Sequence, residues 1–245
     1  MAETAFFTIL DRVESTNNYA MEAVRAGMAG HGKAWFSCNQ SSGKGQRGNK
    51  WQSEPGKNIA LSIVIQPGQF KLSHPFYLSA AIAIACYDFF SAYAGKYVSI
   101  KWPNDLYWHN KKAGGILIEN IHFGKEWKWS VAGIGININQ DDFDIGLKNP
   151  VSLCQVTGEY YDLIALAAEL YQTVMKKITE LNTFPHAALL DAYNNVLFKK
   201  HEQVRLKKAN IVFETVVKEV NSNGQLITTD AIERQFDFGE VEWLL

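Results

Sequence analysis

The chain has 245 residues, of which 47% are hydrophobic and 20% charged, as is usual for a globular protein with a sizeable core. Its formal net charge of −1 argues against a protein whose main task is to coat nucleic acid or an anionic membrane surface. Three cysteines, Cys38, Cys86 and Cys154, are odd in number and far apart, so they predict reduced thiols rather than a disulfide framework.

Neither a secretory signal nor a membrane span is expected. The N-terminal segment has acids at Glu3 and Asp11 and no basic cluster ahead of an apolar run. The longest apolar run, 78–87, is too short to cross a bilayer and is followed by Asp88. We therefore expect a cytoplasmic protein without membrane contact.

The first half of the chain predicts helices alternating with strands. A helix is expected over 15–28, with Ser15, Thr16 or Asn17 as its cap and Gly27 at its end. Strands are expected at 32–39 and 58–67, followed by a buried helix at 74–93 whose apolar residues recur at helical spacing.

From Val98 to 139 the pattern becomes a meander of strands joined by polar turns. A strongly periodic helix follows at 160–181, with Asp162 as its cap, and a further helix at 184–198 has Pro185 in its first turn.

The sequence pattern changes after Lys199 to short, alternating runs rich in β-branched residues, and Asn223-Gly224 predicts a hairpin turn. We therefore predict an α+β domain over 1–198, with a mixed or antiparallel sheet packed with helices, followed by a small β-barrel over 199–245.

One glycine-rich stretch has the spacing of a dinucleotide-binding loop, with glycines at 43, 45 and 48. A dinucleotide loop opens a helix, but Pro55 and Gly56 forbid one here, and no acidic residue lies near position 68. A Walker loop is also excluded, because Asn49 stands where Lys-Ser or Lys-Thr is required.

The same stretch contains three cations and a tryptophan: Lys44, Arg47, Lys50 and Trp51. Glycines let backbone N–H groups approach an anion, cations neutralise phosphate, and an indole face stacks on a base. The stretch predicts a loop that binds a nucleotide, although a plain glycine turn would also account for it.

Two later segments support a ligand site. Lys101 ends an apolar strand just before Trp102-Pro103, an unusual place for a lysine, although its stem could simply cover Trp102. Gly114-Gly115 opens a strand, which suggests close approach of a ligand or backbone. Glycines alternate with isoleucines over 133–139, which also fits a central strand with a packed neighbour.

Five motifs occur in one order along the chain: ESTN at 14–17, QSSGKGQRGNKW at 40–51, KWPNDL at 101–106, KAGGILIE at 112–119 and GIGININ at 133–139. Together they resemble the motifs of the biotin–protein ligases, and the ending GEVEWLL is similar to that family's SH3-like C-terminal domain. The resemblance spans nearly the whole chain and implies a catalytic domain of the class II aminoacyl-tRNA synthetase and biotin ligase type.

The resemblance also implies roles for individual residues. Lys101 would be catalytic, holding the biotin carboxylate and the α-phosphate of ATP. Biotin would be bound by Ser15, Thr16, Asn17, Gln40, Gly115 and Lys101. ATP and the adenylate would be bound by Lys44, Gly45, Gln46, Arg47, Trp51, Lys112 and Asn137.

The implied chemistry has two steps, with biotin and ATP as substrates and Mg²⁺ on the triphosphate. Biotinyl-5′-AMP forms first, and a lysine of a biotin carboxyl carrier protein, a subunit of acetyl-CoA carboxylase or a related carboxylase, then takes the biotin. Asp105 could orient Lys101 or hold magnesium, and the sequence favours neither.

The chain departs from the family's G-R-G-R pattern, because Lys44 and Gln46 stand where arginines are usual. Lysine keeps the charge without the bidentate fork, and glutamine loses the charge. We hypothesise that Arg47, the next residue, supplies the missing charge, so that adenylate retention depends on it.

Alternatives are a lipoate or octanoate ligase, which has a related fold and its own pocket lysine, and a biotin or nucleotide sensor without catalysis. Because ESTN begins at residue 14 and no basic recognition helix is visible, we expect no specific DNA binding. Homodimerisation is left open.

Overall fold

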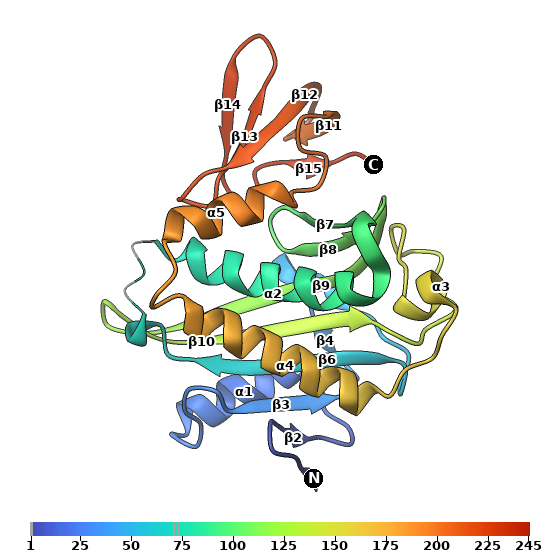
Figure 1. Ribbon diagram of the computed structural model, residues 1–245, viewed down its shortest axis with the longest axis vertical. Coiled ribbons are helices and arrows are strands. Elements are labelled where there is room, and N and C mark those ends of the chain that lie inside the picture. Colours follow the sequence, from blue (N-terminus) through green and yellow to red (C-terminus); the bar gives the residue numbers. More distant parts are fainter. Residues whose placement is uncertain (1, 71, 73) are drawn as a thin grey trace.

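The computed structural model describes residues 2–70, 72 and 74–245 of the chain. Figure 1 shows a large sheet covered by helices, with a smaller sheet formed by the C-terminal part of the chain above it. The large sheet contains β1 (Ala2–Glu3), β2 (Thr8–Ile9), β3 (Ala34–Ser37), β6 (Asn58–Ile65), β7 (Val98–Lys101), β8 (Asp105–Trp108), β9 (Lys111–Phe123) and β10 (Glu126–Asn137).

These eight strands lie in the order β1-β2-β3-β6-β10-β9-β8-β7. Only the β2–β3 pair is parallel, and every other neighbouring pair is antiparallel. The predicted mixed sheet is thereby confirmed, and the meander from Val98 onward forms its second half.

The helices cover the two faces of this sheet. They are α1 (Thr16–Arg25), α2 (Phe76–Ala94), α3 (Leu153–Thr157), α4 (Leu163–Glu180) and α5 (His186–Asn195). Figure 1 shows α2 and α4 in front of the sheet, and α1 lies on the opposite face against β3, β6 and β10.

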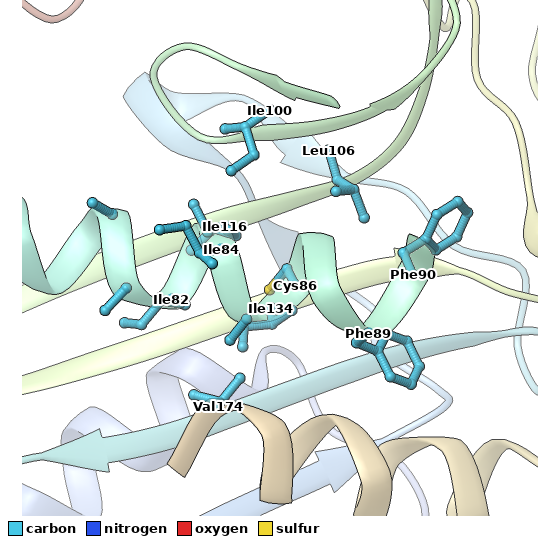
Figure 2. Packing of buried hydrophobic residues seen from close by; sticks show 14 of the residues in the cluster. Ile82, Ile84, Cys86, Phe89, Phe90, Ile100, Leu106, Ile116, Ile134 and Val174 are labelled. Carbon is cyan, nitrogen blue, oxygen red and sulfur yellow. The ribbon is translucent and has the colours of Figure 1, made fainter. Parts of the chain in front are cut away.

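Period-2 alternation in the central strands creates two separate cores. In β6, Ile63 and Ile65 belong to the large core beneath α2 and α4, whereas Val64 belongs to the smaller core beneath α1. Figure 2 shows the large core, where Ile82 of α2 and Val174 of α4 lie close to Ile134 of the sheet. A strand buried on both faces is apolar along most of its length, which explains the apolar run from Ile59 to Ile65 that only Ser62 interrupts.

Local signals correctly mark the starts of the helices. Ser15 accepts a hydrogen bond from the backbone N–H of Asn18 at the start of α1, and Asp162 caps α4 through Ile164 N and Ala165 N. The helix expected at 184–198 is shorter than predicted, with His186–Asn195 helical. The short α3 was not expected, although Ser152 and Gln155 form a capping box that marks it.

Helix α2 and its extension, Phe76–Tyr97, are long and apolar enough to cross a membrane by length and composition. In the structure, however, Ile82, Ala85 and Phe90 of this helix are fully buried in the large core. The apolar character of α2 is therefore explained by its position between the sheet and the neighbouring helices.

The C-terminal sheet is a separate antiparallel unit of five strands in the order β14-β13-β12-β11-β15. Its strands are β11 (Gln203–Lys208), β12 (Ile211–Val220), β13 (Leu226–Thr229), β14 (Glu233–Phe236) and β15 (Glu242–Trp243). The Asn223-Gly224 hairpin turn is confirmed, and it joins β12 to β13. Closure of the sheet into an SH3-like barrel stays a prediction.

Two buried contacts join the C-terminal sheet to the rest of the molecule. Trp102 donates its indole N–H to the carbonyl of Gly224 over 2.8 Å. Asn194 of α5 donates to Val220 O over 2.9 Å and accepts from Val220 N over 2.7 Å. The C-terminal sheet is consequently packed against the rest of the molecule, and the KWPND segment takes part in this contact, whereas the division into domains at 198 stays a prediction.

Gly224→Ala is expected to destabilise the protein by about 1–3 kcal/mol, because Gly224 has φ +83 and a Cβ atom would lie 2.7 Å from Phe76. Urea unfolding monitored by circular dichroism measures the loss. Gly124→Ala is the matched control, since Gly124 has φ +59 but open space around it. Equal losses for both variants would show that contact with Phe76 is unimportant.

Candidate active site

A cavity of about 630 Å³ lies on the α1 face of the sheet and extends to the C-terminal sheet. Residues from the first four sequence motifs, and glycines of the fifth, line it together. Of the predicted site residues, Ser15, Thr16, Asn17, Gln40, Lys44, Gly45, Gln46, Arg47, Trp51, Lys101, Asp105, Lys112 and Gly115 line this cavity. Residues far apart in sequence are thus brought to one place by the fold.

One end of the cavity is a buried network of neutral polar groups. Gln40 Oε1 accepts hydrogen bonds from Thr16 N over 2.7 Å and from Thr16 Oγ1 over 3.1 Å. The hydroxyl of Ser62 lies 2.8 Å from Thr16 Oγ1 and 2.7 Å from Asn17 Oδ1. Hydroxyl and amide groups held this way can satisfy both donors and acceptors of a neutral polar ligand in a dry site.

One member of this network and one charged neighbour were missed in the sequence. Ser62 lies in the middle of the apolar strand β6, and a polar residue in such a run was an available signal. Glu119 accepts from Asn17 Nδ2 over 2.9 Å, and its other oxygen lies 3.6 Å from Lys44 Nζ. Glu119 therefore joins the polar end of the cavity to the glycine-rich loop.

Strand β10 supplies the floor of the site through its glycines. A Cβ atom at Gly133 would lie 2.2 Å from Asn17 Oδ1, and one at Gly135 would lie 2.5 Å from the ring of Trp51. The intervening Ile134 and Ile136 point into the large core. Alternating glycine and isoleucine therefore leave room for site residues on one face and fill the core on the other.

The glycine-rich loop forms a small hairpin of β4 (Gly43–Lys44) and β5 (Lys50–Trp51), joined by a 3-10 turn at Gln46–Gly48. No long helix follows this loop, in agreement with the rejection of a dinucleotide fingerprint. Gln46 donates to the carbonyl of Ile116 over 3.3 Å, and Trp51 lies over Gly135. The loop thereby forms one side of the cavity.

Arg47 extends from this loop to the C-terminal sheet. It adopts φ 55, donates to the carbonyl of Gly239 over 2.7 Å, and lies 6.0 Å from the ring of Phe238. The hypothesis that Arg47 replaces a missing phosphate-binding arginine stays a prediction. The guanidinium thus connects the glycine-rich loop to the C-terminal sheet.

Lys101 ends β7, as predicted, and its ammonium group is flanked by two aromatic rings. The Nζ atom lies 5.1 Å from the ring centre of Tyr107 and 5.5 Å from that of Trp243. Burial lowers the pKa of Lys101, and the nearby Asp105 partly opposes this shift. Among the described residues, no carboxylate lies within ion-pair distance of Lys101, so its charge is available to an anionic ligand.

Asp105 forms an ion pair with Lys112 instead, with Oδ1 2.6 Å from Nζ. Neither sequence alternative for Asp105, orienting Lys101 directly or binding magnesium, included this partner. The pairing places Lys112 beside Lys101 at the same end of the cavity.

Asn137 is the one predicted site residue outside the cavity wall. Alternation puts it on the same face as Gly133 and Gly135, but segment 149–151 covers it there. Its amide donates to Val151 O over 3.1 Å, and the side chain is buried. Asn137 thus supports the segment next to Lys148 and Asn149, which do line the cavity.

The C-terminal sheet contributes a wall that no sequence motif predicted as part of the site. Its lining residues include Phe238, Gly239, Val241, Glu242, Trp243 and Leu245. Glu242 also forms an ion pair with Lys148 over 3.0 Å, although both side chains are largely exposed. No local pattern could reveal this wall, because it depends on how the two sheets pack.

Comparison with known proteins agrees with this geometry. The sequence model of the Biotin/lipoate A/B protein ligase family matches residues 9–137, more than half of the chain. The chain belongs to this family. It is 28% identical over 240 residues to the biotin--[acetyl-CoA-carboxylase] ligase of Paracoccus denitrificans, covering 93% of this chain and 95% of that protein.

Other members of the family are longer. The bifunctional ligase/repressor BirA of Bacillus spizizenii is 34% identical over 155 residues, which cover 62% of this chain and 47% of that protein. The chain thus matches about half of the length of that relative. The biotin protein ligase of Aquifex aeolicus, solved in complex with biotin and ATP, superposes with a TM-score of 0.82 at 20% identity, covering 98% and 99% of the two chains. This likeness shows that the fold of the ligase family extends over the whole chain, the C-terminal sheet included.

Gly135→Ala is expected to displace the Trp51 indole, because the new methyl group would overlap the ring. ¹⁹F NMR of protein labelled with 5-fluorotryptophan would show the Trp51 resonance, assigned with Trp51→Phe, moving or broadening. Gly115→Ala is the control, since its Cβ would meet Lys112 only at 3.5 Å. An unmoved Trp51 resonance in Gly135→Ala would contradict the packing described.

Proposed function

We propose that this protein is an ATP-dependent ligase that activates biotin as biotinyl-5′-AMP and transfers it to a lysine of a biotin carboxyl carrier protein. The observation that carries the proposal is the single cavity in which a neutral polar end, a cationic glycine-rich loop and the unpaired ammonium group of Lys101 meet. This arrangement suits one ligand that is neutral at one end and anionic at the other, next to a nucleotide.

We expect biotin to bind with its ureido ring at the polar end of the cavity. Its fused ureido ring has two donors and one acceptor, which match the amide and hydroxyl groups of Thr16, Asn17 and Gln40, with Ser15 beside them. Its carboxylate would then lie toward Lys101, past Gly115, which also lines the cavity. Partial burial of an ammonium group without a counter-ion is costly, and an incoming carboxylate and phosphate would reduce that cost.

The nucleotide is assigned to the side of the cavity formed by the glycine-rich loop. Lys44, Gly45, Gln46 and Arg47 would face its phosphates, Trp51 its adenine, and Lys112 the triphosphate, whereas Asn137 would act through segment 149–151. Loss of adenylate from Arg47→Ala during gel filtration, with retention by Arg47→Lys, would support the assignment of Arg47. Equal retention by both would oppose it.

Magnesium is expected to enter with ATP. Within the described part of the chain, no group of three or more His, Cys, Asp or Glu side chains could hold a metal ion. Within the KWPND motif, Asp105 is the acid near Lys101, and it is half-buried and paired with Lys112. Phosphate oxygens of ATP would therefore supply most of the magnesium ligands. Bound magnesium would neutralise charge on the triphosphate.

The protein's own residues would mainly position the reactants and balance charge. Lys101 draws the biotin carboxylate and the α-phosphate together, and the carboxylate oxygen forms a bond to phosphorus as pyrophosphate leaves. In the second step the neutral amine of the carrier lysine attacks the mixed anhydride, an amide forms, and AMP leaves with the bonding electrons.

Two features of the site, its polar network and its lysine cation, favour this proposal over two other functions. A lipoate or octanoate ligase needs no polar network at the far end of an acyl pocket, whereas four polar side chains meet there. A sensor without catalysis needs no cation between carboxylate and phosphate. A cytoplasmic location, an SH3-like form of the C-terminal sheet, absence of DNA binding, and any homodimer are further parts of the proposal.

The first test is ATP–pyrophosphate exchange by the purified protein with Mg²⁺, in parallel with biotin, with lipoate and with neither. We expect exchange that requires biotin and falls at least about 100-fold in Lys101→Ala, because the charge that stabilises the transition state is lost. Exchange with lipoate alone would move the protein to the sister activity. No exchange with either acid would overturn the proposal.

The exchange rate is expected to depend on pH through Lys101. The pKa of Lys101 is lowered by burial, so the protonated, active form is lost at a lower pH than for an ordinary lysine. Because kcat/KM reports the free enzyme, the alkaline limb of kcat/KM for biotin against pH should lie below 10.5, the usual lysine value. A limb at or above that value would contradict the assignment of Lys101.

A further inference from the structure

The aromatic surroundings of Lys101 come from two different parts of the molecule. Tyr107 lies on β8, the partner of β7 in the hairpin that carries Lys101. Trp243 lies on β15 of the C-terminal sheet, where it pairs with Leu206 of β11. The lysine predicted to be catalytic is thus held between the large sheet and the C-terminal sheet.

Trp243 is firmly placed. It is 9% exposed, belongs to the large hydrophobic core, and packs against Phe198 with ring centres 5.8 Å apart. Phe198 in turn lies 5.0 Å from Tyr107, so the two rings that flank Lys101 share a buried aromatic neighbour. The distance between the rings is therefore set by packing, and the ammonium group lies within 6 Å of both centres.

If packing were the only requirement at position 243, tryptophan would cost free energy that another apolar residue would not. Its indole N–H is buried and has no hydrogen-bond partner among the described residues. Leucine or phenylalanine would avoid this cost, because neither has a polar atom to bury. What tryptophan offers beyond them is the most negative ring face of any side chain, and this face meets the ammonium group of Lys101.

Charged groups around Lys101 leave it without a dedicated counter-ion. Asp105 on β8 is paired with Lys112 on β9, and Glu242 on β15 is paired with Lys148. The two acids raise the pKa of Lys101 and the two other lysines lower it, so their effects oppose each other. Ring faces therefore stabilise the cation without neutralising it, which keeps its full charge for incoming anions.

Resting on the proposed function, we propose that Trp243 is a positioning residue for Lys101. The Trp243 indole, which is carried by the C-terminal sheet, covers Lys101 and holds its ammonium group where the carboxylate and the α-phosphate would meet. The C-terminal sheet is then a part of the adenylation site, although it contributes no residue to the five ordered motifs.

The test compares Trp243→Leu and Trp243→Phe with the unchanged full-length chain in biotin-dependent pyrophosphate exchange. We expect kcat to fall roughly 10-fold in Trp243→Leu and no more than about 3-fold in Trp243→Phe, which keeps an aromatic face. KM for biotin should change less than about 2-fold, since the polar network is distant. The alkaline limb of kcat/KM for biotin should move to lower pH in Trp243→Leu, because the ring favours the protonated lysine in the free enzyme.

Phe236→Leu is the matched control. Phe236 is a buried aromatic residue of the same C-terminal sheet, packed on Phe213, and it does not line the cavity. It should lower the thermal midpoint as a core substitution while leaving kcat and the pH limb unchanged. Equal kinetic losses in both variants would mean that Trp243 acts only through the stability of the sheet.

Site-specific incorporation of fluorinated tryptophans at position 243 keeps the shape of the side chain and makes its ring face less negative. This test can be carried out even if Trp243→Leu fails to fold. A graded fall in kcat with fluorine number is expected. Competitive labelling of Lys101 across pH, read by mass spectrometry without substrate, should show a parallel fall in its pKa. Unchanged kcat and labelling in an active, folded series would overturn the inference, whereas absence of biotin-dependent exchange in the unmodified protein would overturn the proposed function instead.

Discussion

The site depends on the absence of side chains at two positions of one central strand. Gly133 and Gly135 face the cavity, where any Cβ atom would collide with Asn17 or Trp51, while Ile134 and Ile136 fill the core behind. This alternation lets α1 and the glycine-rich hairpin approach the sheet closely. The polar end of the cavity and the glycine-rich hairpin are then held against the same floor of the sheet, at a fixed distance from each other.

Among the described residues, three lysines of the cavity are paired with carboxylates, whereas Lys101 is not. Lys44 is paired with Glu119, Lys112 with Asp105 and Lys148 with Glu242. Lys101 has aromatic neighbours in place of a carboxylate. An enzyme that joins two anions needs positive charge that is prepared in advance, because reorganising water or an ion pair during the reaction would raise the barrier.

Elements with a strong local signal were predicted well. The cap of α4 at Asp162, the strand ending at Lys101 and the Asn223-Gly224 turn all follow from short-range rules that tertiary packing did not override. Asn137 is a residue for which short-range rules were not sufficient. Its position on the site face was evident from alternation, but segment 149–151 covers it, and only the packed chain reveals this.

The sequence by itself determined the order of the elements, the fold class and most of the cavity residues, because motif residues must keep their chemical type and spacing to work. It did not identify the site contacts of Ser62, Glu119 or Trp243, although Ser62 interrupts an apolar run and Glu119 ends the KAGGILIE motif. These side chains reach the site from the buried strand β6, from within β9 and from the C-terminal sheet. Only the tertiary structure decided their roles, since each role is a distance between segments far apart in the chain, set by how the sheets and helices pack.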